Sequence, residues 1–338
     1  MQCFEYKWGG KALRKKVWRG LAVLLALSLV MTLVAGCGSG DKKAEQKPPE
    51  KKFLNIATGG TSGVYYPLGG AMAEIFNKSI TGVNASAQST GASVANVNAL
   101  KDGSVQIAFV QNDITYYAAN GTEMFKDKKV DGLKGIATLY PETVQIVTLD
   151  KTNIKGIADL KGKRVAVGAA GSGTEANARQ ILEAYGITYK DIKAQYLSFG
   201  EAANNLKDGN VDAAFVTAGF PTAAIQDIAA QHKVVLIPVG GEAVDKVIKQ
   251  YPFYTKVKIP ANTYPNQDKE VEALAVKAML VVTDKMDAQM AYDITKSIYG
   301  NLDRLKTAHA VGKLITKESA REGMSIPLHP GAEKFYKE

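Results

Sequence analysis

Cysteine and histidine are scarce in this chain of 338 residues, and their positions exclude several kinds of active site. The two cysteines, Cys3 and Cys37, both lie near the N-terminus, so the rest of the chain can form no disulfide. The three histidines are His232, His309 and His329, and none lies in the Gly- and Ser-rich loops described below. A histidine-based triad or a soft-metal site therefore lacks its parts. We expect no catalytic residue, no metal and no cofactor.

The apolar segment near the N-terminus is too short to span a membrane. Residues 21–34 form an uncharged run of 14 residues, whereas a spanning helix needs about 20. Six basic residues precede this run and Val34-Ala35-Gly36-Cys37 follows it, which is the layout of a secretory signal. The ending resembles the bacterial lipobox, so we expect residues 1–36 to be cleaved and Cys37 to carry a lipid that anchors the protein outside the cytoplasmic membrane. The alternative is an uncleaved anchor helix.

The strongly basic balance of the chain does not extend to its body. Residues 1–36 hold six of the 42 basic residues and one of the 33 acidic ones, so cleavage lowers the net charge from +9 to +4. A basic body would favour nucleic acid as a partner, and we expect no such partner here. Residues 38–52 lack any large apolar side chain, so we interpret residues 37–52 as the lipidated cysteine and a flexible tether.

From Phe53 onward, short apolar runs alternate with Gly-rich loops and helical stretches, which indicates an α/β fold. The sequence LKDGSVQIAFV at residues 100–110 recurs as LKDGNVDAAFV at residues 206–216, with eight of eleven positions identical. The segments around the two copies also follow in matching order, which predicts two similar lobes.

We assign the lobes from this repeat. Lobe I comprises residues 53–145 and 258–338, and lobe II comprises residues 146–257. The extended runs at residues 144–149 and 234–239 are predicted hinge strands. The C-terminal part of lobe I is expected to contain helices at residues 270–282 and 288–299.

The repeat also predicts where a ligand binds. In open parallel sheets, ligands lie beyond the carboxyl ends of the strands, where loops meet helix N-termini. The corresponding loops of both halves are rich in Gly, Ser and Thr, whose N–H groups and hydroxyls suit an anionic group, although each loop alone is equally explained as a helix cap. The candidate ligand-binding residues are Thr61, Ser62, Gly63, Tyr66, Thr90, Gly91, Ser93, Gln111, Asp113, Tyr140, Ser172, Gly173, Thr174, Thr217, Ala218, Gly219 and Pro221.

Charged side chains are rare in these loops. No arginine lies in them, so a ligand carboxylate is expected to bind backbone N–H groups and hydroxyls, with Arg179 as the alternative. Asp113 directly follows a repeated strand and has two interpretations. It either pairs with an ammonium group of the ligand or caps the helix that begins near Ile114.

Seven segments between Ile56 and the last residue carry a family resemblance: IATGGTSGVYYPLGGAMAEIFN (56–77), QSTGASVANV (88–97), FVQND (109–113), LYPETVQIV (139–147), IADLKGKRVAVGAAGSGTEANARQIL (157–182), FVTAGFPTAAI (215–225) and IPLHPGAEKFYKE (326–338). Together they resemble the TAXI solute receptors of tripartite ATP-independent periplasmic (TRAP) transporters. The resemblance implies a type II periplasmic-binding-protein fold with two α/β lobes joined by hinge strands. It also implies a small carboxylate ligand of the glutamate or C4/C5 dicarboxylate class, and a TRAP membrane permease as partner.

Other function classes find less support in the sequence. Residues 168–174 have the outer spacing of a phosphate loop but carry Thr174 where that motif has lysine, so nucleotide binding is not expected. We therefore expect a binding protein rather than an enzyme. The alternatives are a surface lipoprotein hydrolase, or an adhesin with no role in small-ligand transport.

Overall fold

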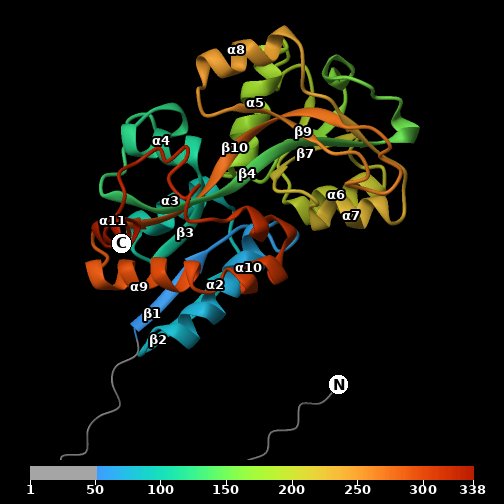
Figure 1. Ribbon diagram of the computed structural model, residues 1–338. Coiled ribbons are helices and arrows are strands. Elements are labelled where there is room, and N and C mark those ends of the chain that lie inside the picture. The colour runs from blue at the N-terminus through green and yellow to red at the C-terminus, as the bar shows by residue number, and fades with distance from the viewer. Residues whose placement is uncertain (1–51) are drawn as a thin grey trace, which may run out of the picture. The chain divides into compact units, whose positions relative to one another are not determined.

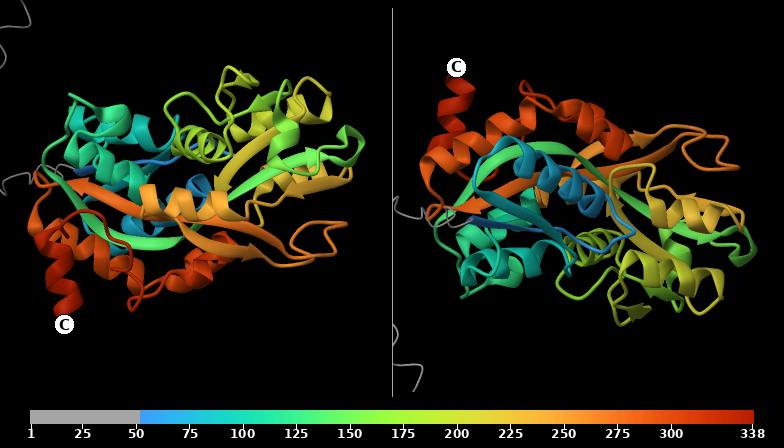
Figure 2. Two further views of the ribbon diagram at one scale, coloured as in Figure 1. Left: turned by 90° about the horizontal axis from the view of Figure 1, so that it is seen from above. Right: turned by 90° about the horizontal axis from the view of Figure 1, so that it is seen from below.

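Two long strands run through the structure and join its two halves. The computed structural model describes residues 52–338, the part drawn in colour in Figure 1. Strand β4 (Leu133–Leu149) is antiparallel to β10 (Val271–Thr283), and Figure 2 shows the two side by side, in green and orange. The signal peptide of residues 1–36, the lipidated Cys37 and the tether up to residue 51 remain predictions, because they lie outside the described residues.

In lobe I, three parallel strands adjoin the long pair. Strand β1 (Lys52–Ala57) lies between β2 (Val83–Gln88) and β3 (Ile107–Gln111) and is parallel to both. Residues 278–281 of β10 then pair antiparallel with β3. These strands agree with the α/β pattern of short apolar runs that the sequence shows from Phe53 onward.

Lobe II repeats this arrangement on the other half of the long pair. Its strands are β5 (Arg164–Ala166), β6 (Lys193–Gln195), β7 (Ala213–Ala218), β8 (Val234–Ile237) and β9 (Thr255–Ile259). Strand β5 lies between β6 and β7 and is parallel to both, while β7 is antiparallel to β4. The carboxyl ends of the parallel strands in both lobes thus carry the loops that were predicted to bind ligand.

The second crossing between the lobes differs from the prediction. The run at residues 234–239 was expected to be a hinge, but β8 pairs with β4 inside lobe II, and β10 makes the crossing. The sequence prediction of a helix at residues 270–282 is therefore wrong. Most of β10 is buried, and a strand buried on both faces has a nearly continuous apolar run that resembles a buried helix. The helix expected at residues 288–299 is confirmed as α9 (Ala288–Tyr299).

Helices cover both faces of the sheet in each lobe (Figure 1). The other helices are α2 (Tyr65–Ser79), α3 (Ser93–Asp102), α4 (Asn112–Asn120), α5 (Gly173–Ala184), α6 (Phe199–Lys207), α7 (Ala223–Ala229), α8 (Glu242–Gln250), α10 (Leu302–Ala308) and α11 (Pro330–Lys337), with short 3-10 turns η1 (Glu123–Phe125), η2 (Asp150–Thr152), η3 (Ile157–Leu160) and η4 (Ala310–Leu314). Helices α9 and α10 pack against α2, and α11 packs against α9, so the C-terminal region returns to lobe I as expected.

The alternation of side chains along the strands builds two apolar cores. Ile107 and Phe109 of β3 lie in one core, whereas Ala108 and Val110 lie in the other, because successive strand residues face opposite sides of the sheet. Both cores contain residues of both lobes. The lobes therefore share one sheet, and their relative position depends on the bending of β4 and β10.

Candidate ligand-binding cleft

A cavity of about 60 Å³ lies between the lobes, enough for more than one water-sized group. Its walls come from the loops after β1 and β2, the end of β3, the loops after β5 and β6, the end of β7, and the middle of β4. The residues that line it are Gly59, Gly60, Gly63, Val64, Tyr65, Thr90, Gly91, Ala92, Ser93, Gln111, Glu142, Ala169, Ser172, Gly173, Thr174, Ser198, Phe199, Thr217 and Ala218.

The structure brings ten of the predicted residues together in this lining. They are Gly63, Thr90, Gly91, Ser93, Gln111, Ser172, Gly173, Thr174, Thr217 and Ala218. They come from both copies of the repeat, five from each lobe. Corresponding loops of the repeat thus face one shared cavity, and their role in ligand binding remains a prediction.

Seven predicted residues lie elsewhere: Thr61, Ser62, Tyr66, Asp113, Tyr140, Gly219 and Pro221. Thr61 and Tyr66 are exposed to solvent. The Ser62 carbonyl accepts a hydrogen bond from the Ala224 N–H of lobe II at 3.2 Å, so this loop makes a contact between the lobes. Pro221 likewise lies outside the lining, where its carbonyl is 3.0 Å from His309 Nε2.

Two helices, α3 and α5, begin at the wall of the cavity. In α5, the Ser172 side chain caps the helix by accepting from the Glu175 N–H at 3.1 Å, and Gly173 and Thr174 form its first turn. Ser93 is the first residue of α3. The first N–H groups of a helix have no partner within it and carry partial positive charge. In α3 the N–H groups of Val94 and Ala95 donate to the Gly171 carbonyl of lobe II, at 3.0 and 3.3 Å, so the start of α5 is the end that suits an anionic group.

Thr90 mainly holds the loop after β2 in shape. Its hydroxyl accepts from the Ala92 N–H at 3.0 Å and lies 2.6 Å from the side-chain oxygen of Asn96. The Asn96 amide in turn donates to the carbonyls of Thr58 and Phe109, at 2.6 and 2.7 Å. This buried network fixes the entrance of α3 relative to β1 and β3.

Nine residues of the lining were not predicted from the sequence, and Glu142 is the charged one among them. It lies in β4 with only 3% of its surface exposed, and Tyr65 Oη donates to its Oε2 at 3.0 Å. Tyr140 Oη, which the sequence analysis placed on the ligand, lies 3.5 Å from Oε1 instead. Burial raises the pKa of the Glu142 carboxyl to about 8, although hydrogen bonds from Tyr65, Gln111 and Tyr140 oppose the rise. A carboxylate inside an apolar strand was the available signal, because glutamate is rarely buried without a partner.

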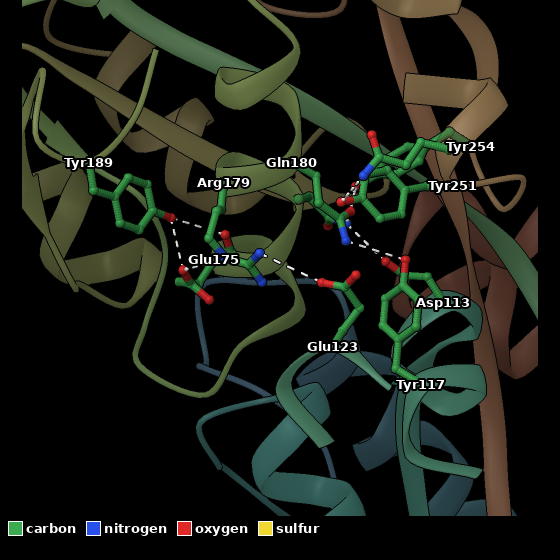
Figure 3. A network of polar contacts seen from close by, with 11 residues as sticks. Asp113, Tyr117, Glu123, Glu175, Arg179, Gln180, Tyr189, Tyr251 and Tyr254 are labelled. Carbon is green, nitrogen blue, oxygen red and sulfur yellow. Dashed lines mark hydrogen bonds and ion pairs between the residues drawn. The ribbon is translucent and has the colours of Figure 1, made fainter. Parts of the chain in front are cut away.

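Beside the cavity, the lobes contact each other through the polar network of Figure 3. Asp113 of α4 points toward α5, where Asn177 donates to its Oδ2 at 3.0 Å. The Gln180 side-chain Nε2 donates to the Tyr117 hydroxyl at 3.3 Å, and the Tyr254 hydroxyl donates to Gln180 Oε1 at 2.7 Å. The structure is therefore a closed form in which lobe II touches lobe I on the flank of the cavity.

Two charged side chains, Asp113 and Arg179, lie at this contact between the lobes and outside the cavity lining. Asp113 is fully buried, which raises its pKa to about 7, and its Oδ1 has no hydrogen-bond partner within residues 52–338. Arg179 points toward Glu123 of lobe I at 3.7 Å and Glu175 of its own helix at 3.7 Å, rather than into the cavity. Arg179 therefore contributes to the contact between the lobes.

Within residues 52–338, no group of three His, Cys, Asp or Glu side chains is arranged to hold a metal ion. In the same range, no helix combines the length and the apolar character needed to cross a membrane.

The sequence and the fold were compared with known proteins. The NMT1-like family matches residues 56–338. PhnD1 from Prochlorococcus marinus (MIT 9301), in complex with methylphosphonate, has 12% sequence identity, covering 79% of this chain and 91% of that one, with a TM-score of 0.52. A protein from Bordetella bronchiseptica RB50 has 18% identity, covering 84% and 85%, with a TM-score of 0.52. The alkanesulfonate-binding protein SsuA from Xanthomonas axonopodis pv. citri, bound to MOPS, has 16% identity, covering 86% and 84%, with a TM-score of 0.48.

These comparisons confirm the fold class and correct the family. The chain has the α/β fold of the periplasmic binding proteins, as the sequence predicted. The resemblance to TAXI receptors of TRAP transporters is a wrong identification, because the family whose model matches residues 56–338 is the NMT1-like one. Five of the seven motifs that carried the resemblance include the end of a strand, and open α/β folds of unrelated families bind ligands at strand ends.

Proposed function

The chain belongs to the NMT1-like family, and we propose that it is an extracytoplasmic solute-binding protein that holds one small solute between its lobes. The observation that carries this proposal is the cavity, which is lined by loops of both lobes and lies where β4 and β10 cross. A solute in that position gains contacts with both lobes only when they are closed. Binding and closure are therefore coupled.

The cavity suits a solute with an anionic group, such as a carboxylate. Ser93 at the start of α3, and Gly173 and Thr174 at the start of α5, place the first N–H groups of two helices at its wall. Such N-termini bind anions through the N–H groups and the helix dipole. In the closed structure the N–H groups of Val94 and Ala95 in α3 donate to the Gly171 carbonyl, so the anion would be held mainly by the start of α5.

The place of action follows from the predicted leader. Residues 1–36 have the layout of a secretory signal, and Cys37 is positioned for lipidation. We propose that the tethered protein captures its solute outside the cytoplasmic membrane and passes it to a membrane transport complex. The opening of the lobes at that complex releases the solute.

The test is a screen of small solutes against the purified protein by thermal unfolding, followed by X-ray scattering with each solute that binds. We expect at least one solute to raise the melting temperature, to lower the radius of gyration and to be recovered chemically unchanged. A solute that binds without compaction contradicts the closure mechanism. Conversion of the solute to a product would favour the hydrolase alternative.

A further inference from the structure

We infer that the solute carries an ammonium group that pairs with Glu142. This inference rests on the proposed function, because it names the chemistry of the solute that the same cavity holds. It starts from the carboxylate of Glu142, which lines the cavity and is almost fully buried.

The Glu142 carboxylate has no cationic partner at the cavity. The lining contains no Lys, Arg or His side chain. A buried charge without a partner costs several kcal/mol. A solute that supplies the missing positive charge therefore binds more tightly than one without it. The tyrosines do not supply it, because Tyr65 and Tyr140 offer only neutral hydroxyls to Glu142.

The cavity also holds hydrogen-bond acceptors that have no donor. Gln111 Oε1 and Thr217 Oγ1 are both buried in its lining, and neither has a hydrogen-bond partner among residues 52–338. Gln111 comes from lobe I and Thr217 from lobe II. An ammonium group has three N–H donors and no acceptor. It can therefore donate one hydrogen bond each to the Glu142 carboxylate, the Gln111 amide oxygen and the Thr217 hydroxyl.

The other interpretation of Glu142 is a neutral carboxylic acid that donates to an anionic solute. The hydroxyls of Tyr65 and Tyr140 and the amide of Gln111 are donors to its oxygens and oppose the neutral form, but burial outweighs them and raises the pKa of Glu142 to about 8. An ammonium group beside the carboxyl shifts this balance to the ionised form. Donors to a carboxylate stabilise the charged state. A neutral Glu142 would also leave the acceptors Gln111 Oε1 and Thr217 Oγ1 facing another acceptor-rich group.

Asp113 provides a matched control. It is the other fully buried carboxylate in this region, but it lies outside the cavity lining and accepts from Asn177 across the lobe contact. Asp113→Asn and Glu142→Gln each remove one buried charge with little change of shape. Only Glu142→Gln should change which solutes are preferred.

The experiment compares paired solutes by calorimetry: glutamate with glutarate, aspartate with succinate, alanine with propionate and leucine with 4-methylpentanoate. Each second member keeps a carboxylate and lacks the amine. We expect an amine-bearing solute to bind, its deamino partner to bind at least roughly 30-fold more weakly, and Glu142→Gln to weaken the amine-bearing solute by a similar factor, as for loss of one partner of a buried charge pair. Asp113→Asn should change both members of a pair by the same factor.

Proton exchange separates the two states of Glu142. In the Asp113→Asn background at pH 7, calorimetry in buffers of different ionisation enthalpy should show a proton released when an amine-bearing solute binds, because burial keeps Glu142 mostly protonated until the ammonium group pairs with it. Tight binding of a deamino solute by this variant without proton release overturns the inference and leaves the proposed function standing. That comparison does not depend on whether Glu142→Gln folds. If no solute of the wider screen compacts the protein, the proposed function itself is wrong.

Discussion

Asp113→Asn should make the protein more stable in alkaline solution, and more stable by a smaller margin in mild acid. Burial between α4 and α5 raises the pKa of Asp113 from 3.8 to about 7. Between these values the folded protein keeps the proton that the unfolded chain has released. Stability from this group therefore falls as the pH rises from about 4, and the loss is complete above about pH 8.

The size of the effect follows from the shift. A rise of about 3 pKa units corresponds to about 4 kcal/mol, because each unit is worth about 1.4 kcal/mol. Part of this energy is recovered if the lobes open and water reaches the carboxylate. Asparagine has a similar shape, carries no charge and still accepts the hydrogen bond that Asn177 donates. We expect Asp113→Asn to raise the free energy of unfolding by about 2 to 4 kcal/mol at pH 8.5, by about 1 to 1.5 kcal/mol at pH 5 and by nearly zero only below about pH 4.

Other titrating groups face Asp113 and must be kept constant. Glu142 of β4 interacts with it electrostatically, as do the tyrosines Tyr117 of α4 and Tyr254 of lobe II. The pKa of Glu142 is raised to about 8, so the unmodified protein loses stability with rising pH from both carboxylates. The difference between Asp113→Asn and the unmodified protein isolates the contribution of Asp113.

Urea unfolding at pH 5 and pH 8.5, with m-values compared, measures this difference. Asp102→Asn is the matched control, because Asp102 is exposed and hydrogen bonds from Ser104 lower its pKa. Its replacement should give a small change of the opposite sign. If Asp113→Asn is no more stable than the unmodified protein at pH 8.5, the carboxylate is hydrated in solution and the closed contact between α4 and α5 is absent there.

Two further substitutions test the cavity and its support. A methyl group at Gly173 would come within 1.8 Å of Gln111 Oε1 in the closed form. Gly173→Ala should therefore weaken solute binding in calorimetry by at least about tenfold, or about 1.4 kcal/mol, with little effect on urea unfolding. Unchanged affinity would show that closure does not bring these residues together. Asn96→Ala leaves the buried carbonyls of Thr58 and Phe109 without their hydrogen-bond donor. It should therefore lower the free energy of unfolding by about 2 to 4 kcal/mol. A decrease of less than about 1 kcal/mol would mean that water replaces the Asn96 amide.

The repeat made most of the fold predictable. Its two copies each end a helix and begin a strand, and the glycine between them adopts the left-handed conformation that only glycine reaches easily, with φ of +79° at Gly103 and +75° at Gly209. Matching loops around both copies then predicted one cavity lined from both sides. Ten residues of that prediction line the observed cavity because strand ends in both lobes point toward it.

The errors have a common physical cause. Strand β10 and the middle of β4 are buried on both faces, so their sequences show neither the alternation of a half-buried strand nor a turn signal. Residues 270–282 were therefore predicted to form a helix, and Glu142 was not recognised as a residue of the cavity. The prediction for Asp113 differs for another reason. A residue that directly follows a strand is expected near the cleft, but this position does not show whether its side chain lines the cavity or lies beside it.

The position of Glu142 joins recognition to closure. It pairs with Val276 of β10, just before β4 leaves lobe I and begins to pair with β7 of lobe II at Thr143. Gln111 at the end of β3 and Thr217 near the end of β7 belong to the strands that flank this long pair, and both line the same cavity as Glu142. Loops rich in glycine and hydroxyls bind many anions, because any exposed N–H group serves. A single carboxylate at the crossing selects among them, and for this reason the residue that the sequence pattern concealed carries more of the specificity than the loops it revealed.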